Sequence, residues 1–161
     1  MLLLHEVLGL LIPIYLTNAL PVLVKGRTPI DGGRLFFDDQ PLFGPSKTVE
    51  GAAVGITGGA LAAVVAHFTL SFPFTVGLIA AWGAVLGDLL SSFVKRRLHL
   101  PSGKPAPLLD AISFLLVPLL LTYPLYIPQG VTIAVALAIT PLSHLVSNGV
   151  AYLIGVKPVP W

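Results

Sequence analysis

The sequence contains no cysteine, and only 10% of its 161 residues carry a charge. Without cysteine there can be no disulfide framework and no thiolate metal site. Soluble domains have about 25% charged residues, so a charge content this low excludes an ordinary soluble protein. The remaining composition agrees, because 55% of the residues are hydrophobic and the mean hydropathy is +0.92. We therefore expect an all-α integral membrane protein.

Several other features are missing. The net charge of +2 gives no indication of nucleic-acid binding. No internal repeat is visible, which argues against a transporter built from inverted repeats. The first apolar run has no basic residues before it and no small-residue cleavage site, so we expect a retained span rather than a signal peptide. Nothing in the sequence predicts the oligomeric state.

Five apolar segments are present, each near the ~20 residues that cross a bilayer. They predict about five transmembrane helices, at about 2–24, 52–70, 74–94, 108–126 and 131–154, in a single membrane domain covering residues 1–161. Small residues one turn apart let helices approach closely. Such spacing occurs at Gly51, Gly55 and Gly59, and again at Gly83 and Gly87, so the second and third spans are expected at the centre of the bundle.

The cations are distributed unevenly. They gather in two longer polar loops, about 25–51 and 95–107, and in the C-terminal tail, and they are absent from the short loops near 71–73 and 128–130. The positive-inside rule then places the N-terminus outside, the C-terminus inside and both polar loops in the cytoplasm of a multi-pass cell-membrane protein. The nine cations are Lys25, Arg27, Arg34, Lys47, Lys95, Arg96, Arg97, Lys104 and Lys157.

The end of the third apolar segment carries a candidate site. Asp88, Ser92 and Lys95 are four and three residues apart, so a helix places them on one face, with Arg96 beside them. A charge inside a span is costly and is usually functional. A carboxylate for Mg²⁺ and cations for phosphate oxygens would suit a metal–phosphate site. Alternatively, the cations only anchor the helix, and Asp88 pairs with one of them.

A second carboxylate, Asp110, begins the fourth apolar segment. It could simply cap the helix. Together with Asp88 it could also share a magnesium site, since Mg²⁺ takes one or two carboxylates and completes its shell with water and substrate phosphates.

The first polar loop ends in GPSKTVEG, from Gly44 to Gly51. A Lys47–Thr48 pair between glycines resembles phosphate-binding loops. It is not a Walker A motif, which would need glycines where Pro41 and Ser46 stand. Thr48 could equally cap the second span.

These motifs resemble those of the membrane cytidylyltransferases that make CDP-activated lipids, represented in bacteria by CDP-diacylglycerol synthase. The matching positions of the third-span signature are Gly87-Asp88, Ser92, Lys95-Arg96 and Asp110. The closer similarity is to the archaeal branch, the CDP-archaeol synthases. It extends over the run Pro29–Gly33, over Asp38 with Gly44, Lys47, Thr48 and Gly51, and over Asn148, Tyr152, Lys157 and Pro160-Trp161 at the C-terminus.

The resemblance implies transfer of CMP from CTP to digeranylgeranylglyceryl phosphate within the bilayer, giving CDP-archaeol and pyrophosphate with Mg²⁺ as cofactor. It implies that Asp88 and Asp110 bind the metal and that Lys47, Lys95 and Arg96 bind phosphates. Ser92, Thr48 and the glycines Gly44 and Gly51 would complete the nucleotide site. The choice of cytosine rests on the resemblance alone.

Two residues depart from the family pattern: Ser113 stands where relatives usually have an aspartate, and Asp39 where they tend to have a glycine. Two other functions remain as alternatives. A CDP-alcohol phosphotransferase would need an aspartate spacing that the Asp31–Arg34 run does not provide. A small lipid or ion transporter could use Asp88 with His144, which belongs to a polar stripe on the fifth segment that also suits helix packing. The stripe consists of Thr140, His144, Ser147 and Asn148.

Overall fold

The computed structural model describes residues 2–102, 104, 106–153 and 155. That part of the chain is all-helical, as expected, with two isolated β-bridges in the first loop. The predictions for Lys157, Pro160 and Trp161, and for the side chains of His144, Ser147 and Asn148, fall outside the described residues. The helices are α1 (Leu2–Ala19), η1 (Leu20–Leu23), α2 (Val49–Leu70), α3 (Phe74–Arg97), α4 (Pro107–Thr122) and α5 (Gly130–Leu153).

Three helical segments are long and apolar enough to cross a membrane, within the part of the chain that the structure describes. They are Leu3–Leu23, which joins α1 to η1, and the helices α2 and α3. The other two expected spans contain shorter apolar stretches, Leu108–Thr122 in α4 and Gly130–Ser143 in α5. Large apolar side chains such as Phe68 and Trp82 are exposed on the outside of the bundle, as lipid-facing positions require.

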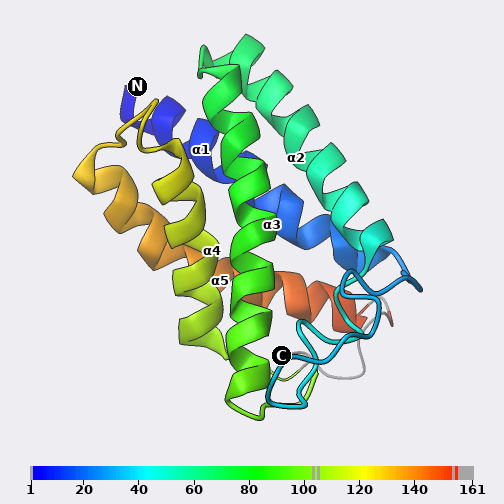
Figure 1. Ribbon diagram of the computed structural model, residues 1–161. Helices are drawn as coiled ribbons and strands as arrows, with labels where there is room; N and C mark the ends of the chain where they lie inside the picture. The colour runs from blue at the N-terminus through cyan, green and yellow to red at the C-terminus, as the bar shows by residue number, and fades with distance from the viewer. Residues whose placement is uncertain (1, 103, 105, 154, 156–161) are drawn as a thin grey trace.

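Helix α3 runs through the middle of the bundle (Figure 1). Helices α2 and α4 flank it, α1 lies behind, and α5 crosses behind the others (Figure 1). The core consists of apolar side chains from several of these helices, among them Leu10 and Ile14 of α1, Ala80 and Ala84 of α3 and Phe114 of α4. Because alanine side chains are small, their presence at the core positions of α3 allows the neighbouring helices to pack close to it.

Glycines allow two of these close approaches. A Cβ at Gly55 of α2 would collide with the backbone oxygen of Thr17 in α1, and a Cβ at Gly87 of α3 would collide with the backbone oxygen of Ser113 in α4. The small residues therefore mark close helix contacts, as expected. Helix α3 is central, as predicted, but α2 lies at the side of the bundle (Figure 1), so the prediction of a central second span is wrong.

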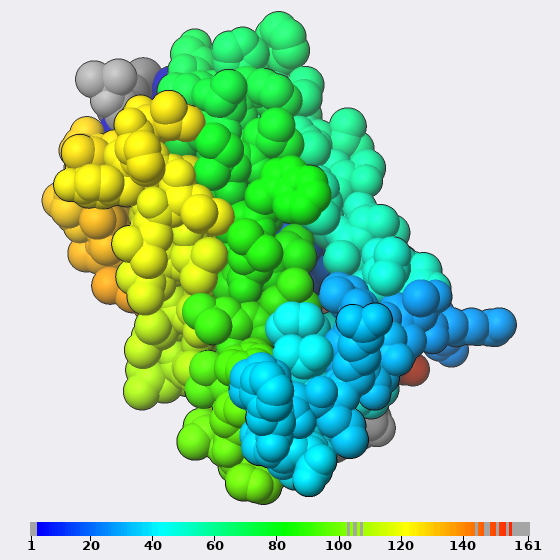
Figure 2. Space-filling view, in the orientation of Figure 1, coloured from blue at the N-terminus to red at the C-terminus, as the bar shows by residue number. Residues whose placement is uncertain are grey.

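The loop between η1 and α2, residues 24–48, is the largest non-helical part of the described chain. It gathers beside the C-terminal end of α3, at the opposite end of the bundle from the N-terminus (Figure 1). In the space-filling view it covers the lower part of α3 (Figure 2). It ends where Thr48 caps α2, accepting a hydrogen bond from the N–H of Gly51 at 3.2 Å. The capping role considered for Thr48 is thus confirmed.

Candidate functional site

The loop 24–48 is shaped by the carboxylate of Asp31. It accepts hydrogen bonds from three backbone N–H groups: that of Gly33 at 2.9 Å, Phe43 at 2.9 Å and Gly44 at 3.0 Å. Burial alone would raise the pKa of Asp31, but the backbone donors stabilise the charged form more strongly, so the pKa lies below its ordinary value. Asp31 therefore ties the two arms of the loop together as an anion.

Arg97 at the end of α3 attaches this loop to the helix. Its Nε lies 2.6 Å from a carboxylate oxygen of Asp38, and its Nη2 donates to the backbone oxygens of Gln40 at 3.1 Å and Pro41 at 2.8 Å. Its guanidinium also lies over the rings of Phe36 and Phe93, at 4.9 and 4.5 Å from their centroids. The loop is thus fixed next to the polar end of α3.

The first ion pair of the site joins the loop to α3. The Nζ of Lys47 lies 2.7 and 2.6 Å from the two carboxylate oxygens of Asp88. About a third of the Asp88 side chain remains accessible. The alternative that Asp88 pairs with Lys95, Arg96 or Arg97 is wrong, because its partner comes from the loop.

The second ion pair joins α3 to α4. The Nζ of Lys95 lies 2.7 Å from an oxygen of Asp110, and the hydroxyl of Ser91 donates to the same oxygen. The other oxygen of Asp110 accepts the backbone N–H of Ala106 at 3.1 Å, just before α4 begins. The N-cap of α4 is Ala106, so the alternative that Asp110 is the capping residue is wrong. Asp110 instead lies in the first turn, accepts the N–H of Ala106 and carries an ion pair.

Arg96 is the most deeply buried cation near these pairs. Its side chain is only 6% exposed, and its Nη2 donates to the backbone oxygen of Pro101 at 3.1 Å. Its Nε is buried without a hydrogen-bond partner within the described part of the chain. A buried donor without a partner is costly, so an anionic ligand here would satisfy Arg96.

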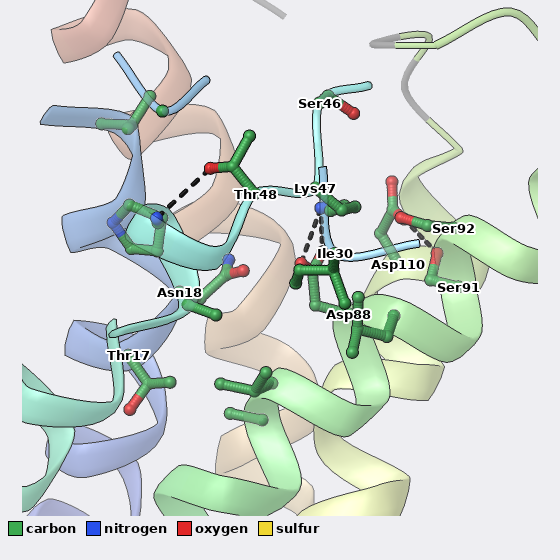
Figure 3. A pocket seen from close by; sticks show the side chains of 18 of the residues that line it. Thr17, Asn18, Ile30, Ser46, Lys47, Thr48, Asp88, Ser91, Ser92 and Asp110 are labelled. Carbon is green, nitrogen blue, oxygen red and sulfur yellow. Dashed lines mark hydrogen bonds and ion pairs between the residues drawn. The ribbon is translucent and has the colours of Figure 1, made fainter. Parts of the chain in front are cut away.

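These residues surround one pocket of about 590 Å³. In the close view, Lys47 with Asp88 and Ser91 with Asp110 lie on one side, and Thr17 and Asn18 of α1 lie on the other (Figure 3). Five cations and two carboxylates are among the described residues that line it: Lys25, Lys47, Lys95, Arg96, Lys104, Asp88 and Asp110. The excess of cations suits a ligand that carries several negative charges.

Most of the residues expected at the site line this pocket. Asp88, Asp110, Ser92, Lys95 and Arg96 all do, and so do Lys47, Thr48 and Gly51 of the loop end. Gly44 is not among the lining residues, and its N–H donates to Asp31. The N–H of Gly51 donates to Thr48. Both glycine amides are thus already used inside the chain, so neither forms an open cradle for phosphate in this conformation.

Two contributors were missed by the sequence argument. Asp31 was noted only as part of a glycine-rich run, although three backbone donors converge on it. Ser92 was predicted at the site instead of its neighbour Ser91, although both serines are buried and both line the pocket. The position of Ser91 one helical turn before Lys95 was the only available signal that it belongs to the site. Its hydrogen-bond partner Asp110 belongs to another helix, so helical spacing could not reveal the contact.

The donor set can be compared with the needs of a magnesium ion. The described residues contain no cluster of three or more His, Cys, Asp or Glu side chains that could hold a metal by themselves. Asp88 and Asp110 nevertheless line the same pocket beside cations that suit phosphate oxygens. Since Mg²⁺ usually takes one or two carboxylates and completes its shell with water and phosphates, the two carboxylates fit an ion that binds together with a phosphorylated ligand.

Fold and site together define a helical membrane protein with a cationic pocket at one end of its bundle, and the charges of this pocket suit a polyanion. The family model described as "CarS-like: CDP-archaeol synthase" matches residues 1–161. The chain belongs to the CDP-archaeol synthase family.

Individual relatives agree with this assignment. The chain is 41% identical to a CDP-archaeol synthase of Pyrococcus furiosus over 163 residues, covering 97% of each chain. It is 44% identical to one of Hyperthermus butylicus over 159 residues, covering 94% of this chain and 92% of the relative. A solved structure described as an intramembrane enzyme for archaeal membrane lipids biosynthesis matches with a TM-score of 0.79 and 36% identity, covering 88% of this chain and 91% of that one.

Proposed function

We propose that this chain is a membrane cytidylyltransferase. It transfers CMP from CTP to an unsaturated archaeal diether lipid phosphate, digeranylgeranylglyceryl phosphate, and releases pyrophosphate and CDP-archaeol. Membership of the CDP-archaeol synthase family supports the reaction. The structural observation that carries the proposal is the single pocket in which two lysine–aspartate pairs and Arg96 meet at the end of an apolar bundle.

The reaction needs no nucleophile from the protein. An oxygen of the lipid phosphate attacks the α-phosphorus of CTP, the new P–O bond forms, and the bond from the α-phosphorus to the bridging oxygen breaks, so pyrophosphate leaves with the electron pair. The protein must align two anions and offset their charge. In this proposal Lys47, Lys95 and Arg96 hold phosphate oxygens, while Ser92 and Thr48 border the nucleotide. Gly44 and Gly51 act indirectly, by shaping the loop.

The two carboxylates have the complementary role. Asp88 and Asp110 would hold Mg²⁺, which neutralises triphosphate charge when bound. Each carboxylate is paired with a lysine in this structure, so the ammonium groups of Lys47 and Lys95 would turn from the carboxylates to the phosphates when substrate binds. Lys47 and Lys95 would thereby neutralise the two carboxylates before the substrate binds and the substrate phosphates afterwards.

We further propose that the chain is one membrane domain with five spans, with its N-terminus outside and the pocket facing the cytoplasm. The distribution of cations supports this orientation. The absence of cysteine makes the test simple, because any introduced cysteine is the only one. In intact cells an impermeant thiol reagent should label Gln129→Cys and spare Phe37→Cys, which replaces a side chain that is 98% exposed on the first loop. The opposite pattern would reverse the orientation.

The decisive activity test is pyrophosphate release by purified protein with each of CTP, ATP, GTP and UTP. Release should require CTP, Mg²⁺ and the lipid phosphate together. Asp88→Asn should lower turnover by a factor on the order of 10²–10³, as the loss of other electrostatic groups does. No release with any nucleotide, from protein shown to be folded, would reject the cytidylyltransferase and favour transport.

A further inference from the structure

The first loop carries an apolar tip, which we define as Leu35, Phe36 and Phe37. These three consecutive side chains are 58%, 37% and 98% exposed. The chain turns directly after them, where the N–H of Phe36 donates to the backbone oxygen of Gln40 and the N–H of Asp39 donates to that of Phe36. No residue of the tip lines the pocket. Large apolar side chains exposed together mark a contact with a partner or with a membrane.

The apolar tip packs against the last turns of α3. The rings of Phe36 and Phe93 meet edge to face with 5.2 Å between their centroids, and the ring of Phe37 lies 4.9 Å from that of Phe36. The guanidinium of Arg97 lies over both Phe36 and Phe93, and it pairs with Asp38 just after the tip. These contacts fix the tip to one particular face of α3.

That face of α3 is its lipid-facing side. Three apolar residues at four-residue spacing are each about half exposed along it, and Phe93 follows the last of them after three residues, so all four lie on one face of the helix. The three residues are Trp82, Leu86 and Leu90. At about 100° per residue, the pocket residues Asp88 and Lys95 lie on the opposite face. In the space-filling view the loop covers the lower part of α3 directly below the uncovered surface of the same helix (Figure 2). The tip therefore extends the lipid-facing surface of α3.

The position of Phe93 along α3 matches a membrane boundary. Helix α3 begins at Phe74 and rises about 1.5 Å per residue, so Phe93 lies about 29 Å further along it. The hydrocarbon layer of a bilayer is about 30 Å thick. A helix that enters this layer at its first turn brings Phe93, and with it the apolar tip, to the opposite boundary. Phenylalanine and leucine side chains of interfacial segments insert at this depth.

We propose that the apolar tip inserts into the lipid leaflet on the pocket side of the membrane. The inference requires only that the helices cross a bilayer, and it is independent of the reaction proposed above. The exposed residues Arg34 and Asp39 flank the tip, and their charged groups stay among the lipid head groups. The loop then straddles α3, because lipid holds its tip on one face while Lys47 at its end reaches Asp88 on the other.

The test measures the depth of the tip in phosphatidylcholine vesicles that contain no other protein. A nitroxide attached to Leu35→Cys carries the only thiol in the chain and leaves both phenylalanines in place. Its accessibility to dissolved oxygen, which concentrates in the bilayer, should exceed its accessibility to a water-soluble nickel chelate several-fold. A nitroxide at Ser102→Cys is the matched control and should show the reverse, because Ser102 is exposed in the loop beyond the end of α3.

A charge at Phe37 tests the lipid contact directly. Since this side chain makes almost no contact that excludes water, Phe37→Glu should unfold in detergent at the same temperature as the parent protein. In vesicles it should raise the chelate accessibility of the Leu35→Cys label several-fold, because a carboxylate draws the tip out of the leaflet. Phe37→Leu keeps the side chain apolar and should leave the label at its original depth.

Three results would overturn the proposal. Chelate accessibility as high at Leu35→Cys as at Ser102→Cys would place the tip in water, where a soluble protein could bind it. Spin–spin broadening that disappears when labelled chains are diluted with unlabelled ones would assign the tip to a contact with a second copy. A label that stays buried after Phe37→Glu would show that the side chain of Phe37 does not hold the tip in lipid.

Discussion

The ammonium of Lys47 contacts both carboxylate oxygens of Asp88, although the two residues are 41 positions apart in the sequence. It occupies the oxygens that a magnesium ion would need. In the proposed mechanism Lys47 would neutralise Asp88 until a triphosphate draws the ammonium away. Metal binding and nucleotide binding should therefore be coupled.

Replacing Lys47 by methionine should separate these two roles. Without the ammonium, Asp88 is free for a metal, so Lys47→Met should bind Mn²⁺ about tenfold more tightly in the absence of nucleotide, a change of about 1.4 kcal/mol. The affinity for CTP should fall, because a phosphate partner is lost. Electron paramagnetic resonance measures Mn²⁺ binding, and calorimetry measures CTP binding.

Lys104 provides the matched control. It lines the same pocket but makes no ion pair within the described residues. Lys104→Met should leave Mn²⁺ binding as it is. Equal Mn²⁺ affinities for the wild type and Lys47→Met would show that the lysine does not compete with metal.

Ser91 is expected to position Asp110. It is almost fully buried and donates to the oxygen that Lys95 also contacts. Hydrogen bonds to charged groups contribute about 1.5–3 kcal/mol, so Ser91→Ala should lower turnover about tenfold or more. It should also raise the Mg²⁺ concentration needed for half-maximal rate, which a purely structural role would not do.

The variant Ser91→Thr keeps the hydroxyl and should restore much of the metal dependence. Ser92→Ala removes an equally buried hydroxyl one residue away and should leave the Mg²⁺ requirement near that of the wild type. Identical metal dependence in Ser91→Ala and Ser92→Ala would rule out the positioning role.

The low pKa of Asp31 predicts how the first loop responds to acid. Because the pKa in the folded chain lies below the ordinary value of 3.8, the carboxylate stabilises the loop fully above that value, and this contribution is lost as the pH falls through the folded pKa. Limited proteolysis should cut residues 32–43 only at the acid end of a titration from pH 7 to pH 3.

Asp31→Asn should make the loop sensitive to protease at every pH in that range, since a neutral amide accepts the three backbone donors less well. Asp39→Asn on the exposed side of the same loop is the control, and asparagine tolerates the positive φ of 57° found there. A cleavage pattern that does not change between Asp31→Asn and the wild type would refute the anchoring role.

Gly87 should be the most sensitive of the helix-packing positions next to the site. A methyl group there would collide with the backbone of Ser113, which cannot move without shifting α4. Overpacking typically costs about 1–3 kcal/mol, so Gly87→Ala should lower the midpoint of thermal unfolding in detergent by several degrees. Gly130→Ala has no atom within 4 Å of its new methyl and should unfold like the wild type.

Much of the site could be predicted because its carboxylates stand out from an apolar background. Asp88 lies within a membrane-crossing helix, so the cost of burying charge identified it. Asp110 was identified as a second carboxylate, at the start of an apolar segment, that could share a magnesium site with Asp88. Lys95 and Arg96 followed from their helical spacing relative to Asp88, and Lys47 followed from the similarity of its loop to phosphate-binding loops. The glycine spacings identified α2 and α3 as helices with closely packed faces, since only small residues allow backbones to approach so closely, but they did not identify the partner helices α1 and α4.

The ion-pair partners of Asp88 and Asp110 could not be predicted in the same way. Helical spacing relates only residues of one helix, so it grouped Asp88 with Lys95, whereas their partners are Lys47 and Asp110. Choosing Ser91 over Ser92 requires the position of α4 relative to α3, which no local pattern contains. The role of Asp31 depends on a loop that returns to it after twelve residues.

The surplus of cations around the pocket also has a kinetic consequence. Five cations against two carboxylates create a positive field that attracts a nucleotide before any contact forms. At the ionic strength of a cell this attraction extends about 8 Å beyond the opening. Added salt should therefore slow the capture of nucleotide and lower kcat/KM, while kcat at saturating nucleotide stays nearly constant.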